Sequence, residues 1–224
     1  SNLISGLINM PSSAFRFSLK GNYTNSKILI EYRQVGPEYV SLGNPFLRNN
    51  TRQFTVSDRA SFLKNKLFIN FGFKHLDNKI LRTTVNPLNT NTFFVNFNFL
   101  PGPGLPSYAV SLQSIGKNNE KTKLDSVGSS IVDLREDSNI SNNMLAFTVP
   151  LKSNGIMHNV TLNMGNVTNL DNLSSRRDVS YLFPKTDTRT IALNVASEFS
   201  KTLNTISQVS QTKLDIPSVS NNTL

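Results

Sequence analysis

Apolar and polar residues alternate along most of this chain with a period of two. A β-strand with one apolar face and one polar face has this period. About ten segments follow it, and the last of them is mostly polar. They lie at residues 15–23, 27–35, 54–62, 67–74, 93–99, 108–112, 145–149, 160–164, 191–199 and 203–214. The pattern predicts an all-β protein.

The connections between these segments alternate in length. Short turns near residues 25, 65, 103, 154 and 202 alternate with long loops at about 36–52, 76–91, 116–142 and 167–188. Up-and-down barrels of outer membranes place short turns on the periplasmic side and long loops outside the cell. We therefore predict an antiparallel up-and-down transmembrane β-barrel. A lipocalin-like barrel or a β-sandwich is the soluble alternative.

In a membrane barrel, the apolar face of each strand contacts lipid. The residues expected there are Phe17, Leu19, Ile28, Ile30, Leu67, Ile69, Phe71, Phe73, Val95, Phe97, Val110, Phe147, Leu162 and Leu193. Aromatic residues next to the short turns would form an interfacial girdle, because amphipathic rings favour the headgroup zone. These are Tyr23, Phe62, Phe99, Tyr108 and Phe199. Aromatic residues also favour strands in general, so the girdle is one of two interpretations.

The opposite face is polar and carries the candidates for lining the lumen. These are Arg16, Lys20, Glu31, Arg33, Arg59, Lys74, Asn96, Asn98, Gln113, Asn163 and Asn194. Basic residues dominate the first four segments, with Glu31 as their one clear acidic companion. Because Lys and Arg lower the cost of anion entry into a pore, this face predicts a porin-like passage or a scaffold with mild anion preference. Alternatively, these charges bind a plug or one another.

Composition narrows the remaining classes of protein. Apolar residues make up 38% of the 224 residues and charged residues 17%. No run of about 18 apolar residues occurs, which excludes a transmembrane helix. Cysteine is absent, so disulfides and thiolate chemistry are excluded. The net charge of +9 would suit nucleic acid, but the basic residues are spread out and Arg176 with Arg177 is their only adjacent pair. We expect no nucleic-acid partner.

The first and the last of the ten predicted strands indicate that further strands are missing at each end. If the short turns are periplasmic, residues 15–23 descend and residues 203–214 ascend, so both ends lie outside the cell. A complete bacterial barrel normally returns both termini to the periplasm, and this chain also ends without a closing strand or terminal aromatic residue. We expect a fragment of a larger barrel. In it, residues 1–12 are a remnant strand or extracellular segment, 13–215 the barrel strands with their connections, and 216–224 a tail. Any signal peptide is expected to have been removed or to lie outside this sequence.

One stretch resembles a known class of proteins. It reads YRQVGPEYVSLGNPFLRNN at residues 32–50, followed by FLKNKL at 62–67 and GFK at 72–74. It is similar to a recurring stretch of large outer-membrane barrel proteins of Gram-negative bacteria, in which a strand enters a long extracellular loop and returns through a short periplasmic turn. The resemblance covers about residues 27–115. It implies a location in the outer membrane with the long loops extracellular, and it implies neither a solute nor catalytic residues.

Candidate catalytic chemistry is sparse. His75 and Asp77 faintly resemble the pair at the rim of outer-membrane proteases, which would suggest a rim-located hydrolase, but His75 continues the apolar phase of Phe73. A proton-transfer site needs a polar cleft and a second partner. His158 likewise shares a face with Val160 beside a short turn. We expect interfacial positions for both histidines and no enzyme.

The longest loop holds the one candidate metal site. Its acidic residues are Glu120, Asp125, Asp133, Glu136 and Asp137. Oxygen ligands of this kind suit calcium, but the spacing matches no EF-hand loop. Four basic residues nearly cancel the charge: Lys117, Lys121, Lys123 and Arg135. We expect a solvated loop of mixed charge, without metal or cofactor.

The expected partners are therefore outer-membrane lipid, small anionic solutes and other envelope proteins. A second class of protein is an open alternative to the outer-membrane barrel. It is a soluble or surface-exposed β-sandwich or barrel, whose long Asn-rich and Ser-rich loops would bind a partner or serve adhesion.

Overall fold

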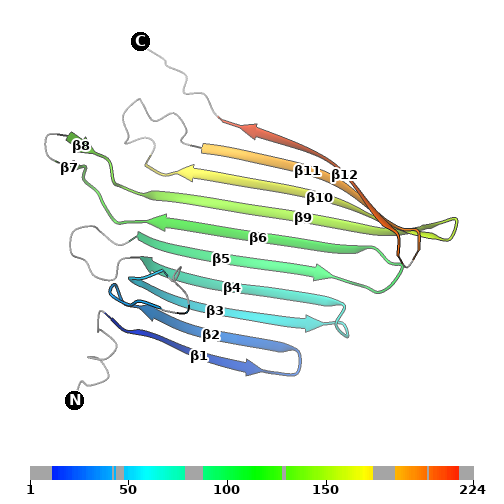
Figure 1. The fold of residues 1–224 in the computed structure, drawn as a ribbon, viewed down its shortest axis with the longest axis horizontal. Coiled ribbons are helices and arrows are strands. Elements are labelled where there is room, and N and C mark those ends of the chain that lie inside the picture. Colours follow the sequence, from blue (N-terminus) through cyan, green and yellow to red (C-terminus); the bar gives the residue numbers. More distant parts are fainter. Residues whose placement is uncertain are drawn as a thin grey trace, which may run out of the picture.

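The long strands of the chain form one antiparallel sheet in the computed structural model (Figure 1). The structure describes residues 12–41, 43, 48–78, 88–127, 130–173, 185–200 and 202–216. The ten strands of the sheet are β1 (Ala14–Asn22), β2 (Ser26–Val35), β3 (Thr51–Phe62), β4 (Leu67–Asn78), β5 (Leu88–Phe99), β6 (Ser107–Asn118), β9 (Asp137–Ser153), β10 (Ile156–Asp171), β11 (Lys185–Glu198) and β12 (Asn204–Asp215). Two short strands, β7 (Asp125–Val127) and β8 (Ser130–Val132), pair with each other. The predicted all-β antiparallel fold is confirmed.

The order of the strands in the sheet is their order in the chain. The short turns therefore all lie at one end of the sheet, termed the turn end, and the long connections lie at the other, termed the loop end (Figure 1). β1 begins and β12 ends at the loop end. This is the up-and-down topology that the alternating connection lengths predicted.

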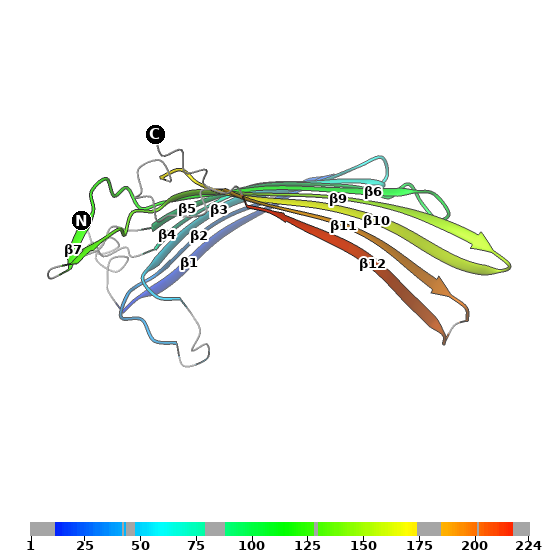
Figure 2. The same cartoon turned by 90° about the horizontal axis from the view of Figure 1, so that it is seen from above.

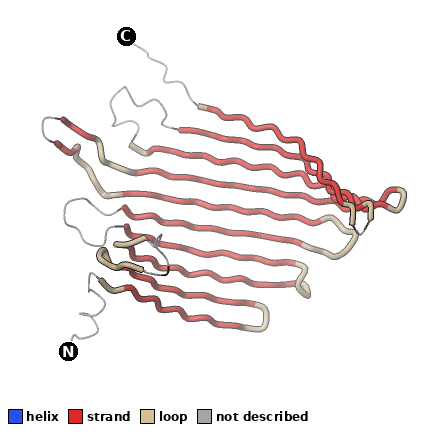
Figure 3. Tube along the Cα trace, in the orientation of Figure 1, coloured by secondary structure: helices blue, strands red, loops and turns tan. Residues whose placement is uncertain are grey.

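Only strands, turns and loops occur in the described ranges (Figure 3). No helix there is long and apolar enough to cross a membrane.

Several strands run further toward the loop end than the alternation predicted. β4 continues to Asn78, β9 begins at Asp137 and β10 ends at Asp171. The segment expected as one long loop at 116–142 also contains the β7–β8 hairpin. Polar residues continue these strands because backbone hydrogen bonds between neighbours form whatever the side chains are. The period-two signal marks only those parts of a strand that have an apolar face.

A two-residue turn fixes the register of β9 and β10. Asn154 and Gly155 have positive φ angles of 51° and 80°, as a type I′ hairpin turn requires. They join Ser153 to Ile156, which are register partners. A slip by one residue would move every side chain of a strand to the other face. This turn therefore also determines which side chains of β9 and β10 lie on each face of the sheet.

The described sheet is a single bowed layer with almost no apolar core (Figure 2). Its buried apolar side chains are Val35, Ala60, Leu173 and Ala192. The accessible surface of the chain is 15767 Å², about one and a half times the roughly 10,000 Å² expected for a compact protein of 24.9 kDa. In the described ranges, no second layer covers either face of the sheet.

The described sheet does not close on itself. Among the described strands, β1 pairs only with β2 and β12 only with β11. Figure 1 places β1 and β12 at opposite margins of the sheet. The remnant strand and tail expected near the ends, and the pair Arg176 and Arg177, fall almost entirely outside the described residues.

Candidate functional site: the polar face of the sheet

The register of the strands sorts the side chains onto two faces. Residues paired across neighbouring strands share a face, and successive residues of one strand lie on opposite faces. One row of paired residues runs through Leu19, Ile30, Val56, Phe73 and Phe93. The side of the sheet that carries this row is termed the apolar face, and the opposite side the polar face.

The residues predicted to face lipid all lie on the apolar face, from Phe17 in β1 to Leu193 in β11. Many are well exposed, since nothing covers them in the described ranges: Phe17 is 63% exposed, Phe71 45% and Leu193 45%. Soluble monomers rarely expose contiguous apolar patches beyond a few hundred Å². The apolar patch on this face extends from β1 to β11.

Aromatic rings gather on the apolar face at the turn end. The ring centroids of Phe99 and Tyr108 are 6.4 Å apart, and those of Tyr108 and Phe147 are 4.8 Å apart. The other predicted girdle residues, Tyr23, Phe62 and Phe199, stand beside or within short turns at the same end. The structure thus brings the predicted girdle residues to one end of the sheet, and their contact with headgroups stays a prediction.

Two ionisable side chains interrupt the apolar region of this face. Asp58 is the register partner of Ile28, and its Oδ1 accepts a hydrogen bond from the Ser26 hydroxyl. Nδ1 of His158 lies 2.8 Å from Oγ of Ser197. Each ionisable group therefore has a hydroxyl partner on a neighbouring strand.

His75 also lies on the apolar face, at the loop end, as its phase predicted. Its Nε2 is 2.9 Å from Asp77 Oδ1, and its Nδ1 is 2.6 Å from Asn91 Oδ1. Both ring nitrogens are thus engaged by neighbours on the same face. In the described part of the chain, no hydroxyl nucleophile contacts the imidazole, so the geometry gives the rim-hydrolase hypothesis no support.

Every residue predicted for the lumen lies on the polar face. β1 to β4 form its basic sector. Lys20, Arg33, Arg59 and Lys74 all belong to this sector, and none of them forms an ion pair within the described ranges. Their positive charge is therefore available to solutes near this face.

Glu31 is the acidic residue of the basic sector, and Arg16 neutralises it. Glu31 is only 9% exposed, and its Oε2 accepts a hydrogen bond of 2.8 Å from Nε of Arg16. A charge-assisted contact of this kind compensates for part of the desolvation of the carboxylate. The pair leaves the remaining cations of the sector without an acidic neighbour on the described strands of this face.

The polar face of β5 to β12 forms a neutral sector. Its charged residues lie only in the end rows: Lys117 and Asp171 at the loop end, and Lys152 and Glu198 at the turn end. Between these rows, Ser111 Oγ donates a hydrogen bond of 2.7 Å to Asn96 Oδ1. The hydroxyl oxygens of Thr148 and Thr161 are 2.9 Å apart. Between its end rows, this sector therefore carries amides, hydroxyls and apolar side chains, and no charged side chain.

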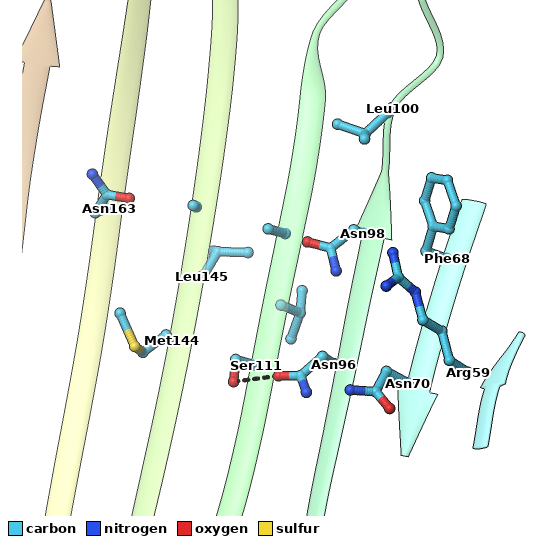
Figure 4. Close-up of a pocket in the computed structure, with 13 residues that line it drawn as sticks. Arg59, Phe68, Asn70, Asn96, Asn98, Leu100, Ser111, Met144, Leu145 and Asn163 are labelled. Atoms are coloured by element: carbon cyan, nitrogen blue, oxygen red, sulfur yellow. Dashed lines mark hydrogen bonds between the residues drawn. The ribbon is translucent and has the colours of Figure 1, made fainter. Parts of the chain in front are cut away.

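A hollow of about 590 Å³ lies on the polar face where the two sectors meet (Figure 4). Arg59 and Phe68 stand on its basic side, and Met144 and Asn163 stand on its neutral side. Asn96 lies between them and carries the hydrogen bond from Ser111. This hollow is the candidate site that combines charge, amides and apolar surface.

Hydrogen bonds of the Asn119 side chain hold the connection between β6 and β9 at the loop end, and Asn119 is 7% exposed. Its Nδ2 donates to the Leu134 carbonyl at 2.6 Å, and its Oδ1 accepts from the backbone N–H of Glu136 at 2.9 Å. Beside it, Nε of Arg135 lies 2.9 Å from Asp133 Oδ1. The hydrogen bond that Arg135 donates to the Asp133 carboxylate, aided by the negative charge of Asp133, raises the pKa of Arg135 above its ordinary value.

The described acidic side chains of this connection engage separate partners. Asp133 forms an ion pair with Arg135, and Asp137 accepts a hydrogen bond from the side chain of Asn172 at 2.8 Å. Within the described ranges, no group of three or more His, Asp or Glu side chains could hold a metal ion.

Sequence reasoning missed two aromatic residues on the polar face. Phe68 and Phe94 point away from the apolar face, although each stands beside apolar neighbours in the chain. The ring of Phe94 covers Gly72, where an added Cβ would be 2.6 Å from Phe94 Cζ. The guanidinium carbon of Arg59 lies 5.7 Å from the centre of the Phe68 ring. The even positions of Phe68 and Phe94 in their strands already indicated the polar face. Both residues stand in runs of consecutive apolar residues, where alternation is hard to recognise.

Comparison with models of protein families, with curated proteins and with solved structures found nothing that matches this chain. The resemblance to outer-membrane barrels therefore has no support beyond the all-strand antiparallel sheet itself.

Proposed function

We propose that this protein is an outer-membrane β-barrel, or ten strands of a larger one, whose polar face lines an aqueous passage with mild anion preference. One observation carries the proposal: apolar side chains cover this face from β1 to β11, and no second layer covers them in the described ranges. Exposed to water, such a face would promote aggregation. Against hydrocarbon, it would lie in a matching solvent, and paired strands would satisfy the backbone.

The height of the apolar face supports this proposal. On β10, the apolar-face positions from Ile156 to Met164, which are apolar except for His158, extend roughly 27 Å at about 3.4 Å per residue. At the tilt of about 40° typical of barrel strands, this run would span roughly 21 Å, close to the apolar band of about 25 Å in outer-membrane barrels. Beyond it, the same face carries Asn166 and Thr168. These polar positions would lie outside the hydrocarbon.

The polar face supports an aqueous passage. Amides and hydroxyls recur through its neutral sector, and such groups are costly to bury without partners. The basic sector carries Lys20, Arg33, Arg59 and Lys74 without ion-pair partners among the described residues. Lysines and arginines that line an anion pathway lower the energy of an entering anion. A porin-like channel, or a transport or assembly scaffold, would use such a surface.

Fractionation and conductance test the proposal. The protein should leave cell envelopes only with detergent, and its gel mobility should shift when the folded sample is heated. In planar bilayers it should conduct, with chloride more permeant than potassium. Release by high salt or alkali without detergent would overturn the membrane assignment. Absent conductance or cation selectivity would overturn the anion passage alone.

The open sheet favours a second candidate, a soluble or surface-exposed β-protein that binds a partner. Within the described residues, β1 and β12 each have one unpaired edge, and such an edge can accept a strand from another chain. This candidate requires a partner that also covers the apolar face. Fractionation separates the two, because the protein of this second candidate would be released without detergent.

A further inference from the structure

The hollow on the polar face is built from two neighbouring rows of paired residues. The first row is Arg59, Asn70, Asn96, Ser111 and Met144. The second row is Phe68, Asn98, Ala109, Ala146 and Asn163. Two rows on one face of a strand are roughly 7 Å apart. The side chains of both rows therefore line a single volume of about 590 Å³.

The residue sizes within the two rows explain the shape of the hollow. Ala109, Ser111 and Ala146 have short side chains and form its floor on β6 and β9. Longer side chains stand on both sides of this floor, including Arg59 and Met144 (Figure 4). The floor is thus recessed because its side chains are short.

The polar groups of the hollow are open to a ligand. Within the described ranges, the side-chain amides of Asn70, Asn98 and Asn163 have no hydrogen-bond partner. Oδ1 of Asn96 accepts from Ser111, which leaves the Asn96 amide nitrogen as a donor. Unlike a hydroxyl or a cation, an amide offers separate donor and acceptor atoms. Such a row suits a ligand with several hydroxyl groups.

The electrostatics of the hollow select for negative charge. Arg59 is its one charged lining residue, and no carboxylate lines it. The guanidinium lies over the face of Phe68, 5.7 Å from the ring centre, which restrains it through a cation–π contact. A planar guanidinium pairs well with a planar carboxylate, because two N–H groups can face two oxygens.

We propose that this hollow binds an acidic saccharide. Arg59 holds the carboxylate of the sugar, Asn70, Asn96 and Asn98 hydrogen-bond its hydroxyl groups, and its C–H surfaces pack on the alanines of the floor. A neutral sugar lacks the group that Arg59 recognises. A small carboxylate such as citrate lacks the series of hydroxyls that the amides recognise. The inference rests on the proposed function only for the route by which the saccharide reaches this face.

Calorimetry on the full-length protein in detergent micelles tests the inference with three probes: trigalacturonate, maltotriose and citrate. Trigalacturonate should bind with a Kd of about 1 mM or lower, at least about tenfold tighter than maltotriose and citrate. Absence of measurable trigalacturonate binding would overturn the proposal. Equal affinity for maltotriose would overturn the role of charge, and equal affinity for citrate would overturn the role of the amides.

A matched pair of charge variants locates the site. Arg59→Gln should weaken trigalacturonate binding by about tenfold, because a charge-assisted hydrogen bond is lost. Lys152→Gln removes the same charge from the same face but from its end row at the turn end, outside the hollow, and should change the affinity by less than about twofold. Asn98→Ala should weaken binding by about threefold or more. Equal losses in Arg59→Gln and Lys152→Gln would show that the overall charge of the face, and not the hollow, attracts the ligand.

The binding assay is independent of the conductance assay. A protein that binds trigalacturonate but does not conduct would refute the passage and leave the site intact. A conducting protein that does not bind trigalacturonate would refute the site alone.

Discussion

At the scale of single residues, Gly72 shows how little added volume one position of the polar face accepts, and Asp58 shows how the apolar face accommodates a carboxylate. Gly72 lies on the polar face under the ring of Phe94, and an added Cβ would also lie 2.8 Å from the backbone oxygen of Val56. The ring can rotate away, but the carbonyl belongs to the β3–β4 pair. Asp58 lies on the apolar face with the Ser26 hydroxyl as its hydrogen-bond partner. Period-two alternation reveals neither contact, because both depend on neighbours in other strands.

Gly72→Ala should lower the free energy of unfolding by about 1–3 kcal/mol, as overpacking in a close-packed site does. Gly165→Ala is the matched control, since Gly165 also lies on the polar face and its added Cβ meets nothing within 4 Å. The control should stay within about 0.5 kcal/mol of the parent protein. Urea unfolding in lipid vesicles measures both, and equal effects would contradict the packing argument.

Asp58 reports on what surrounds the apolar face. If hydrocarbon does, the ionised carboxylate is costly, and Asp58→Asn keeps an acceptor for Ser26 while removing the charge. The variant should raise the free energy of unfolding in vesicles by about 1 kcal/mol. Glu38→Gln, at an exposed position between β2 and β3, should change nothing measurable. A loss of stability in Asp58→Asn would argue for a partner specific to the carboxylate.

At the scale of elements, alternation found all ten strands of the sheet but underestimated their length. Each strand was visible where one face is apolar, as in the run from Leu67 to Phe73 in β4. The loop-end part of β9 was not visible, because Asn139, Ser141 and Asn143 are polar although they continue the apolar face. Backbone pairing with β6 and β10 holds that part in the sheet, and sequence polarity carries no signal for it.

Asn119 is expected to order the connection between β6 and β9, because its amide bonds the backbone of both Leu134 and Glu136. Asn119→Ala should increase the rate of tryptic cleavage at Lys121 and Lys123 by about fivefold or more, as the loss of three half-buried hydrogen bonds favours local opening. Heat-modifiable gel mobility should persist, because the long strands stay paired. Thr122→Ala, at an exposed neighbouring position, is the control, and equal cleavage in both variants would contradict this role.

At the scale of the whole molecule, the strand order places a basic sector beside a neutral one on a single face. The sequence predicted which of the candidate lumen residues share this face, because alternate residues of a strand always lie on the same side of a sheet. It did not predict the hollow, because Arg59, Asn96 and Met144 become neighbours only through the register of four successive strand pairs. Each pair adds a choice of register that local patterning leaves open.

Under the proposed function, the basic sector sets ion selectivity. Replacing Lys20, Arg33 and Lys74 together with Gln should lower the permeability ratio of chloride to potassium by at least about twofold, because the local positive potential falls. The double variant Lys121→Gln and Lys123→Gln lies in the β6–β9 connection and should change the ratio less. Reversal potentials in a salt gradient give the ratio. An unchanged ratio in the triple variant would place the ion pathway elsewhere.

With so few buried apolar side chains, the described sheet depends on its surroundings to fold. Among the described residues, Val35, Ala60, Leu173 and Ala192 are the buried apolar side chains, so this part of the chain gains little hydrophobic free energy by folding alone in water, where burial is the main favourable contribution. Its native state would then exist only together with an amphiphile, so refolding should begin when micelles or vesicles are added and not when denaturant is diluted. A cell that makes this protein would have to keep it unfolded until it reaches a lipid surface.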